Sequence, residues 1–269
     1  MQAELQRRAA AARRIVMAQA GRMHRGFGRA QATLKTDGTR VTAADLAISA
    51  AVLARLHAAF PGDQAFSEEL PVAPPAPALT ARFCWVLDPI DGTNNYAAGI
   101  PFCAISLALL ECGRPVYGVV YDLARRTLIH GGPGAGAVDG GRPARVRPEP
   151  PHEHSLVAVH SPYEPRMVPQ AAAMLAGFKT RGLGSSALHL AYVGIGLLDG
   201  VLDHNVRFWD IAAAHAIALG GGAEIHYFRN NPFPLRRLDP DPPRIHYLAG
   251  NTAICRRMQR LLRASGGAG

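Results

Sequence analysis

The residues with the clearest chemical potential form the run Asp88-Pro89-Ile90-Asp91-Gly92-Thr93. This run follows Phe83 to Leu87, whose length and apolar composition predict a buried strand. The proline disfavours helix at that point, and Gly92 permits a close approach of the backbone to a ligand. Two nearby carboxylates with a backbone carbonyl between them supply the hard oxygen ligands that Mg²⁺ prefers. The run therefore indicates a metal and phosphate site, with an ordinary surface turn as the open alternative.

Helices and strands must hold this run in place, and the spacing of apolar residues locates several of them. A first helix is predicted over residues 2–27, and a second from Ala43 to about Phe60, with Thr42 as its N-cap and Asp45 in its first turn. Strand-forming residues around turns predict paired strands at 105–110, 115–121 and 127–130. Later predicted elements are strands at 156–160, 224–228 and 245–249, and helices at 168–175, 186–198, 211–219 and 253–263.

Composition narrows the class of protein. The chain has 269 residues, a formal charge of +9 and 48% hydrophobic residues. No uncharged apolar run approaches the ~20 residues that span a bilayer, so we expect a globular protein that makes no membrane contact. The Ala/Arg-rich start lacks the apolar core of a secretory signal, which favours the cytoplasm. The basic balance would suit an anionic substrate or nucleic acid.

Five short motifs together carry a resemblance that none of them carries alone. In chain order they are Lys35 with Asp37-Gly38-Thr39, Thr42-Ala43-Ala44-Asp45, Ser67-Glu68-Glu69, Asp88 to Thr93, and Trp209-Asp210. Their residue types and order resemble the inositol monophosphatase family over nearly the whole chain. The resemblance implies an α/β (α+β) fold of the layered αβαβα sugar-phosphatase type. It also implies a Mg²⁺-dependent, Li⁺-sensitive phosphomonoesterase that forms a homodimer.

The resemblance also implies a set of oxygen ligands for two or three Mg²⁺ ions per subunit. These ligands would be Glu68, Asp88, the Ile90 carbonyl, Asp91 and Asp210, with Asp88 bridging two ions. Four carboxylates supply the negative field that holds such ions, and the ions would offset substrate charge and activate water. Taken alone, Asp210 could instead be the N-cap of the helix that follows it, and the two roles are compatible.

Other residues of the motifs would handle the water and the phosphate. In the family, a threonine and an aspartate at the positions of Thr93 and Asp45 orient and deprotonate the attacking water, and a lysine at Lys35 lies near it. Gly92 and Thr93 would bind the phosphate through the free amides of a helix that starts there. Taken alone, Asp45 is a negative charge that favours the start of a helix.

Substrate contacts are implied at Asp91, Ser186 and Asp203. Inositol-specific members of the family tend to have an alanine and a glutamate at the positions of Ser186 and Asp203. A hydroxyl and a shorter acid would change the hydrogen bonds around the leaving alcohol, and polar sites discriminate strongly between such patterns. We therefore expect a small phosphorylated alcohol as substrate, either inositol monophosphate or a related sugar or polyol phosphate.

Several alternatives remain open within and outside this chemistry. The same family includes fructose-1,6-bisphosphatases, histidinol-phosphate phosphatases and 3′-phosphonucleotide phosphatases. From another class, the arginine pairs at 7–8, 13–14, 236–237 and 256–257 could serve a regulator that binds RNA or protein, although no nucleic-acid motif accompanies them. The eleven histidines lack the paired spacing of zinc hydrolases, so we expect them to be surface or core residues.

A change in composition near residues 145–154 predicts a boundary between two lobes that share the active site. The N-terminal α+β lobe, residues 1–145, would carry the metal and phosphate motifs. The C-terminal α/β lobe, residues 146–269, would carry the substrate contacts and one metal ligand.

Overall fold

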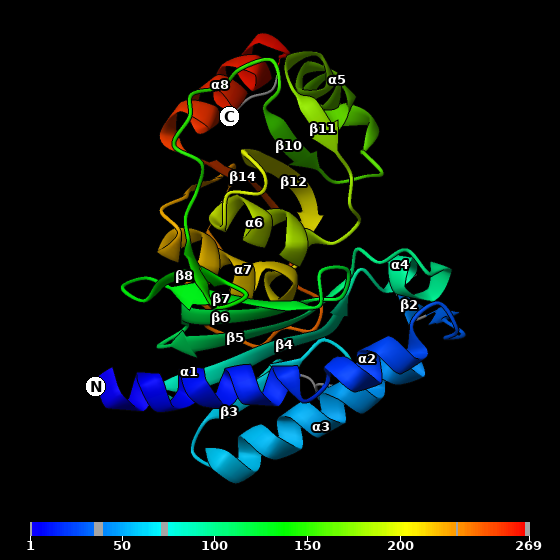
Figure 1. The fold of residues 1–269 in the computed structure, drawn as a ribbon, viewed down its shortest axis with the longest axis vertical. Coiled ribbons are helices and arrows are strands. Elements are labelled where there is room, and N and C mark those ends of the chain that lie inside the picture. The colour runs from blue at the N-terminus through cyan, green and yellow to red at the C-terminus, as the bar shows by residue number, and fades with distance from the viewer. Residues whose placement is uncertain (1, 35–39, 71–74, 230, 267–269) are drawn as a thin grey trace.

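The computed structural model describes residues 2–34, 40–70, 75–229 and 231–266. Figure 1 shows alternating layers along the long axis of the molecule: helices, a sheet, helices, a second sheet and a last layer of helices. This is the αβαβα arrangement that the motifs implied, so the predicted fold class is confirmed.

The first sheet is built entirely from the N-terminal half of the chain. Its strands, in their order across the sheet, are β3 (Gln64–Ser67), β4 (Phe83–Asp91), β5 (Ala104–Glu111), β6 (Arg114–Asp122), β7 (Thr127–Gly132), β8 (Gly136–Asp139) and β9 (Arg142–Ala144). β3 and β4 pair in parallel, and each later neighbour pairs antiparallel. The parallel pair brings the C-terminal ends of β3 and β4 to the same edge of the sheet.

The second sheet comes from the C-terminal half and has mixed strand directions. Its order is β11 (Lys179–Arg181), β10 (Leu156–Val159), β12 (Gly200–Val206), β14 (Ile245–Gly250) and β13 (Glu224–Tyr227). β10 pairs in parallel with both β11 and β12, and β14 pairs antiparallel with β12 and β13. The C-terminal end of β10 therefore lies beside the middle of β12.

Three layers of helices cover the two sheets. The outer layer on the first sheet contains α1 (Gln2–Met17), α2 (Ala20–Gly26) and α3 (Ala43–Ala59), and the layer between the sheets contains α6 (Ser186–Gly194) and α7 (Phe208–Gly220). The far face of the second sheet is covered by α5 (Val168–Gly177) and α8 (Thr252–Ala264). Shorter elements are α4 (Thr93–Ala98), a 3-10 turn (Pro165–Met167) and the hairpin of β1 (Thr33–Leu34) and β2 (Arg40–Val41).

β4 shows how this layering is encoded in the sequence. Phe83, Trp85 and Leu87 belong to the core under the outer helices, whereas Cys84 and Val86 belong to the core between the sheets. All nine residues of β4 are buried, because helices cover both faces of the sheet. The fold therefore requires apolar side chains on both faces of β4.

The opening motif is part of this strand and not a separate turn. β4 continues to Asp91, although its pairing with β5 is irregular between Asp88 and Asp91. Pro89 lies in the irregular stretch, and a proline has no N–H to donate to a ladder. The alternative of an ordinary surface turn is wrong, because a strand with a local irregularity carries both carboxylates into the interior.

Most of the other predicted elements are confirmed with small shifts. The predicted first helix is divided into α1 and α2 at residues 18–19, and the three predicted strands after residue 104 correspond to β5, β6 and β7. The glycine-rich segment 131–141, for which no strand is predicted above, contains β8. β12 was not predicted, because Asp203, His204 and Asn205 interrupt its apolar pattern.

The proposed boundary between lobes falls in the connection between the two sheets, after β9 and before β10. One apolar core nevertheless contains residues from both halves, including Val86 and Val120 of the first sheet and Val201 of the second. α7 packs against strands of the first sheet although it follows β12 of the second. The division at residue 145 therefore stays a proposal.

Candidate active site

Three carboxylates from three different elements converge at the edge of the first sheet. Glu68 follows β3, Asp88 lies near the end of β4, and Asp210 lies in the first turn of α7. One carboxylate oxygen from each residue lies within 4.8 Å of the others. The sequence separates Glu68 from Asp210 by more than half the chain, so only the fold brings them together.

Backbone pairing places Glu68 beside Asp88. The parallel ladder sets Ser67 opposite Leu87, and the Glu68 amide donates to the Leu87 carbonyl at 3.1 Å. Glu68, the residue after β3, therefore lies beside Asp88, where the irregular stretch of β4 begins.

Aromatic packing brings Asp210 to the same point. The Phe66 ring on β3 lies 5.4 Å from the Trp209 ring, which is 2% exposed. Asp210 is the third residue of α7, and its Oδ2 accepts from the Arg207 amide at 2.7 Å. The prediction that Asp210 is the N-cap is therefore wrong, because Arg207 has that position and Asp210 bonds back to it.

The surroundings of Asp88 and Asp210 oppose the negative charges of these two acids. Burial raises the pKa of Asp88 well above its usual range, and the charges of Glu68, Asp91, Asp210 and Asp45 add to the effect. Burial and the charges of Asp91 and Glu68 likewise raise the pKa of Asp210. Carboxylates this close repel one another unless a cation lies between them. The arrangement thus fits a divalent cation with oxygen ligands.

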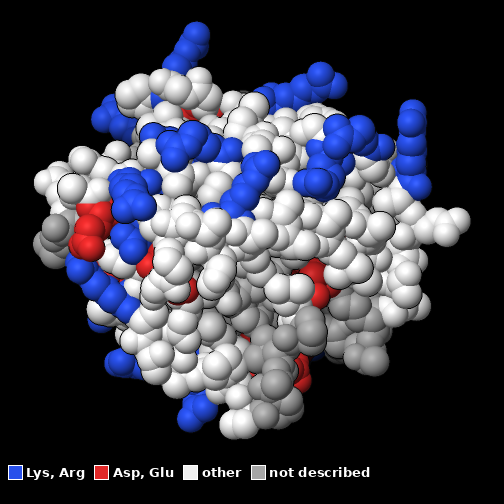
Figure 2. Space-filling model, turned by 90° about the horizontal axis from the view of Figure 1, so that it is seen from below, with Lys and Arg blue, Asp and Glu red and all other residues white. Residues whose placement is uncertain are grey.

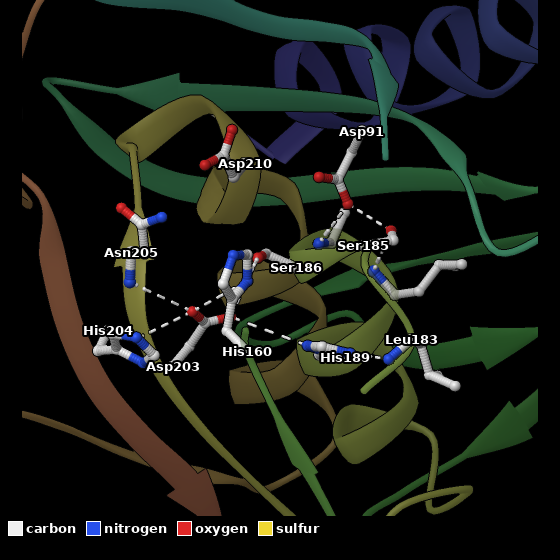
Figure 3. A network of polar contacts seen from close by, with 12 residues as sticks. Asp91, His160, Leu183, Ser185, Ser186, His189, Asp203, His204, Asn205 and Asp210 are labelled. Atoms are coloured by element: carbon white, nitrogen blue, oxygen red, sulfur yellow. Dashed lines mark hydrogen bonds and ion pairs between the residues drawn. The ribbon is translucent and has the colours of Figure 1, made fainter. Parts of the chain in front are cut away.

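Asp91 lies beside these acids but outside the group of three, and its carboxylate is held by the first turn of α6. Its Oδ2 accepts from the Ser185 hydroxyl and from the Ala187 amide at 2.7 Å. Burial raises the pKa of Asp91 to about 6, against the opposing effect of these hydrogen bonds. Asp91 therefore links the metal motif to the C-terminal half of the protein, as Figure 3 shows.

Asp45, Thr93 and the Ile90 carbonyl form a second small group behind the cluster. Asp45 accepts from the Thr42 amide at 2.8 Å and from the Thr42 hydroxyl at 2.5 Å through its Oδ2. Its Oδ1 faces the Thr93 hydroxyl at 3.5 Å, while that hydroxyl donates to the Ile90 carbonyl at 2.9 Å. Burial raises the pKa of Asp45 to about 6, with Glu68 contributing through its charge. A carboxylate with this pKa is ionised at neutral pH and remains basic enough to accept a proton.

Gly92 occupies a position that admits no side chain. Its φ of 87° lies in the left-handed region, and a Cβ there would lie 2.9 Å from the Phe102 carbonyl and 3.1 Å from the Gly184 carbonyl. Asn95, in the helix that follows, donates to the carbonyls of Phe102 and Leu183 at 2.7 and 2.6 Å. This bridge fixes the loop before α6 against the start of α4.

The other predicted substrate residues, Ser186 and Asp203, lie next to each other. The Ser186 hydroxyl donates to Asp203 Oδ2 at 3.0 Å, and the His204 amide donates to Oδ1 at 2.9 Å. The Asp203 carboxylate is fully buried, with His160 Nδ1 3.4 Å and His189 Nδ1 3.8 Å from its oxygens. Burial opposes its ionisation, but the neighbouring imidazoles outweigh burial and lower the pKa of Asp203.

With this geometry established, the chain was compared with known proteins. The sequence model of the inositol monophosphatase family matches residues 2–262. The chain belongs to the inositol monophosphatase family.

Individual relatives of this family carry different names. Nus factor SuhB from Xylella fastidiosa is 32% identical over 69% of this chain and 69% of its own length. A fructose-1,6-bisphosphatase from Pyrococcus furiosus is 37% identical over 54% of this chain and 56% of its own length. The solved structure of Thermotoga maritima IMPase, 25% identical, superposes with a TM-score of 0.81 over 94% of this chain and 95% of that one.

Membership of the inositol monophosphatase family makes this chain a phosphatase of the phosphoric monoester hydrolase class, in a family that depends on metal ions and acts on small phosphorylated substrates. Within the described residues, no helix is both long and apolar enough to cross a membrane.

Some residues of the site were not found from the sequence, and one predicted residue is not described. Lys35 lies outside the described residues. His160, His189 and Asn95 were not predicted as site residues. The histidines were compared only with the paired spacing of zinc hydrolases, and Asn95 lies outside the five motifs. The signal available for His189 was its place one turn after Ser185 and Ser186, which puts all three on the end of α6 that faces the site.

Proposed function

We propose that this protein is a Mg²⁺-dependent phosphatase that hydrolyses a small phosphomonoester, inositol monophosphate or a related sugar or polyol phosphate. The observation that carries the proposal is the convergence of Glu68, Asp88 and Asp210 within 4.8 Å. Two of these acids, Asp88 and Asp210, have raised pKa values, and such a group of buried or half-buried acids is a costly arrangement for a protein with no cation to bind. The same acids are a good set of ligands for one that binds Mg²⁺.

The proposed ligands are Glu68, Asp88, Asp91, Asp210 and the Ile90 carbonyl, for two or three ions per subunit. All of them offer oxygen, which suits Mg²⁺ better than zinc. When bound, the ions would offset the charge of the phosphate dianion and make a water nucleophile available at neutral pH.

The chain's own residues would orient that water and receive its proton. Thr93 has one hydroxyl proton and two acceptors in reach, Asp45 and the Ile90 carbonyl. Donation to Asp45 leaves the lone pairs of the hydroxyl free to accept a hydrogen bond from the attacking water. Asp45 is fixed by Thr42 through one oxygen, so its other oxygen can receive the proton through Thr93. We assign Asp45 and Thr93 to this role, and Lys35 to a contact near the same water.

Gly92 and Thr93 are the proposed phosphate contacts, because α4 begins there and the first amides of a helix have no partner within the helix. Asp91, Ser186 and Asp203 are the proposed contacts to the alcohol half. The alternatives within the family are a fructose-1,6-bisphosphatase, a histidinol-phosphate phosphatase and a 3′-phosphonucleotide phosphatase. We further propose a cytoplasmic homodimer inhibited by Li⁺.

Phosphate release with and without Mg²⁺ tests the proposal, using the wild type and Asp91→Asn on inositol monophosphate and a panel of sugar phosphates. We expect activity that requires Mg²⁺ and falls at least a hundredfold in the variant. Glu153→Gln is a matched control, since Glu153 is an exposed acid far along the chain from every proposed ligand. Equal activity in all conditions would refute the proposal.

A second candidate function is binding of RNA or protein through the basic surface. Relatives named Nus factor SuhB motivate it. Figure 2 shows Lys and Arg side chains spread in separate patches over the face seen from below. Two arginines of the pairs at 7–8 and 13–14 have structural partners: Arg8 pairs with Asp63 at 2.7 Å, and Arg13 donates to the Tyr117 hydroxyl at 2.9 Å. RNA binding at ~50 mM salt with a steep salt dependence would favour this function, and its absence would remove it.

A further inference from the structure

The buried carboxylate of Asp203 needs a positive charge beside it. It is fully buried, and an isolated ion in such a place is strongly unfavourable. Among the described residues, neither an arginine nor a lysine pairs with it. Its nearest ionisable neighbours are His160 and His189. One of these two imidazoles must therefore carry the balancing charge.

His189 is committed to the neutral form by its other contact. Its Nε2 accepts a hydrogen bond from the Leu183 amide at 2.9 Å, which requires a lone pair on that nitrogen. The proton of the ring is then on Nδ1, which faces Asp203 at 3.8 Å. A doubly protonated ring would set two N–H groups against each other at Leu183.

His204 is also unable to supply the charge. Its Nε2 lies 3.3 Å from the Pro162 carbonyl, and its ring stacks on Tyr163 with centroids 4.4 Å apart. Only its backbone amide reaches Asp203. Burial lowers the pKa of His204, which keeps the ring neutral.

His160 is the remaining imidazole that could balance the charge of Asp203. Its position also allows its ring to face a substrate. The parallel register pairs Val159 with Leu202, so His160 follows β10 in step with Asp203. Its Nδ1 lies 3.4 Å from Asp203 Oδ1 and 3.3 Å from the Ser186 hydroxyl. Burial would lower the pKa of His160, but Asp203 and the more distant Asp91 and Asp210 raise it above its usual value.

The second nitrogen of His160 is directed at the active site. Figure 3 shows the ring between Asp203 and the side on which Asp91 and Asp210 lie. The side chain is 20% exposed, and no described residue hydrogen-bonds to its Nε2. In an imidazolium this nitrogen is a donor, so it offers a charged N–H to whatever lies beside the scissile phosphate.

We propose that His160, held by the buried Asp203, is the specificity residue for the alcohol half of the substrate and selects an alcohol that carries a second anionic group, a phosphate or a carboxylate. This inference rests on the proposed phosphatase function and narrows its substrate class. Asp203 then also acts on the substrate through His160, as its positioning residue, because the buried carboxylate accepts from the Ser186 hydroxyl and the His204 amide and lies 3.4 Å from His160 Nδ1.

A charged N–H on His160 would favour some of the candidate substrates in "Proposed function" over others. A bisphosphate of a sugar or nucleoside places a second dianion next to the scissile ester, which a charged N–H binds well. Inositol monophosphate offers only hydroxyl groups to His160. Histidinol phosphate brings an ammonium group, which the imidazolium repels.

The test compares kcat/KM, with Mg²⁺, for two matched pairs of phosphomonoesters. These pairs are 2-phosphoglycerate with glycerol 2-phosphate, and fructose 1,6-bisphosphate with fructose 1-phosphate. We expect the wild type to prefer the anionic member of at least one pair by about tenfold or more. His160→Gln keeps a neutral donor near the Nε2 position, and His160→Asn keeps a donor near Nδ1. Both should remove most of this preference, mainly through KM of the anionic member.

Two further variants separate specificity from structure. Asp203→Asn removes the group that keeps His160 charged and should lower the same preference. His57→Gln, at an exposed histidine on α3, should leave the preference unchanged. The inference about His160 is overturned if the wild type shows no preference in either pair, or if the preference survives in His160→Gln and His160→Asn. The proposed phosphatase function is not affected by these outcomes. No phosphate release from any of the four esters overturns the proposed function together with it.

Discussion

Two groups of polar side chains lie on either side of the first turn of α6, and the acids in them have opposite surroundings. The carboxylate cluster consists of Glu68, Asp88 and Asp210 with Asp91 beside them, and the Asp203 network consists of Asp203, His160, His189 and Ser186. Neighbouring serines contact the two groups: Ser185 donates to Asp91, and Ser186 donates to Asp203. In the cluster, acids lie close to acids, and the pKa values of Asp88, Asp91 and Asp210 are raised, whereas Asp203 faces imidazoles and its pKa is lowered.

The difference teaches how charge is balanced in each region. In the carboxylate cluster, burial and neighbouring acids oppose the ionisation of Asp88 and Asp210, so cations from solution would stabilise the ionised cluster. The Asp203 network contains its own cation in His160. Without bound metal, the ionised carboxylates of the cluster are therefore unfavourable, which suits this region to binding metal. The ionised Asp203 is stabilised by its own network, which suits that region to orienting one side chain.

The largest expected effect comes from removing the central charge of the carboxylate cluster. Asp88→Asn should lower Mg²⁺-dependent phosphate release by at least about a thousandfold, because the proposed ion loses the ligand that the other acids surround. Steady-state assays over a range of Mg²⁺ concentrations measure this. Activity restored by high Mg²⁺ would mean that Asp88 only tunes affinity.

Stability should respond with opposite signs in the two regions. In the absence of divalent metal, Asp88→Asn should raise the free energy of unfolding by about 1 to 2 kcal/mol, since it removes repulsion between buried acids. Asp203→Asn should lower it by about 2 to 3 kcal/mol, since it leaves His160 without its partner. Denaturant unfolding in EDTA gives both values, and a destabilised Asp88→Asn would contradict the comparison.

The pH dependence of stability provides a sharper test of the carboxylate cluster. The folded-state pKa of Asp91 is about 6, above its ordinary value, so the folded protein binds a proton more tightly than the unfolded chain does. Its contribution to stability is fully present below about pH 4 and is lost as the pH rises through 6. Metal-free wild type should therefore lose on the order of 2 to 3 kcal/mol relative to Asp91→Asn between pH 4 and pH 7.

Addition of Mg²⁺ at pH 7 should reverse this loss in the wild type and have little effect on Asp91→Asn. A stability difference between the two proteins that is independent of pH would show that Asp91 has an ordinary pKa.

The smallest effect concerns the single hydroxyl of the Asp203 network. Ser186→Ala removes one of several donors to Asp203, so it should lower the free energy of unfolding by about 1 kcal/mol. The substitution introduces the alanine that inositol-specific members of the family tend to have at this position. It leaves the contact between His160 and Asp203 in place. Unfolding curves at pH 7 measure the change, and a loss as large as that of Asp203→Asn would mean that the hydroxyl, not the imidazole, holds the carboxylate.

The sequence was informative where residues act within one short segment. The apolar run at Phe83 to Leu87 predicted β4, and Thr42 with Asp45 predicted the start of α3. These two elements depend on local backbone preference and on patterns along a single element, which a sequence displays directly. The layered fold was implied by the resemblance that the ordered motifs carry together.

The Asp203 network could not be predicted in the same way, because its members meet only through the second sheet. His160 ends β10 and Asp203 lies in β12, a strand whose polar residues hide its apolar pattern. The charge of His160 also depends on which nitrogen of His189 accepts from Leu183, a contact that no spacing reveals. The burial of Asp88 could not be decided from its own segment either, since an Asp-Pro pair near a glycine also suits a surface turn.

The most direct measurement of the central claim is anomalous diffraction from crystals grown with Mn²⁺ and phosphate. The account predicts a Mn²⁺ peak bound by Glu68, Asp88 and Asp210, with phosphate oxygen completing its shell near Gly92 and Thr93. It also predicts that the side chains of the Asp203 network keep their positions and bind no ion. Saturating Mn²⁺ that gives no peak at the carboxylate cluster, or a peak bound by Asp203 and His160 instead, would contradict it.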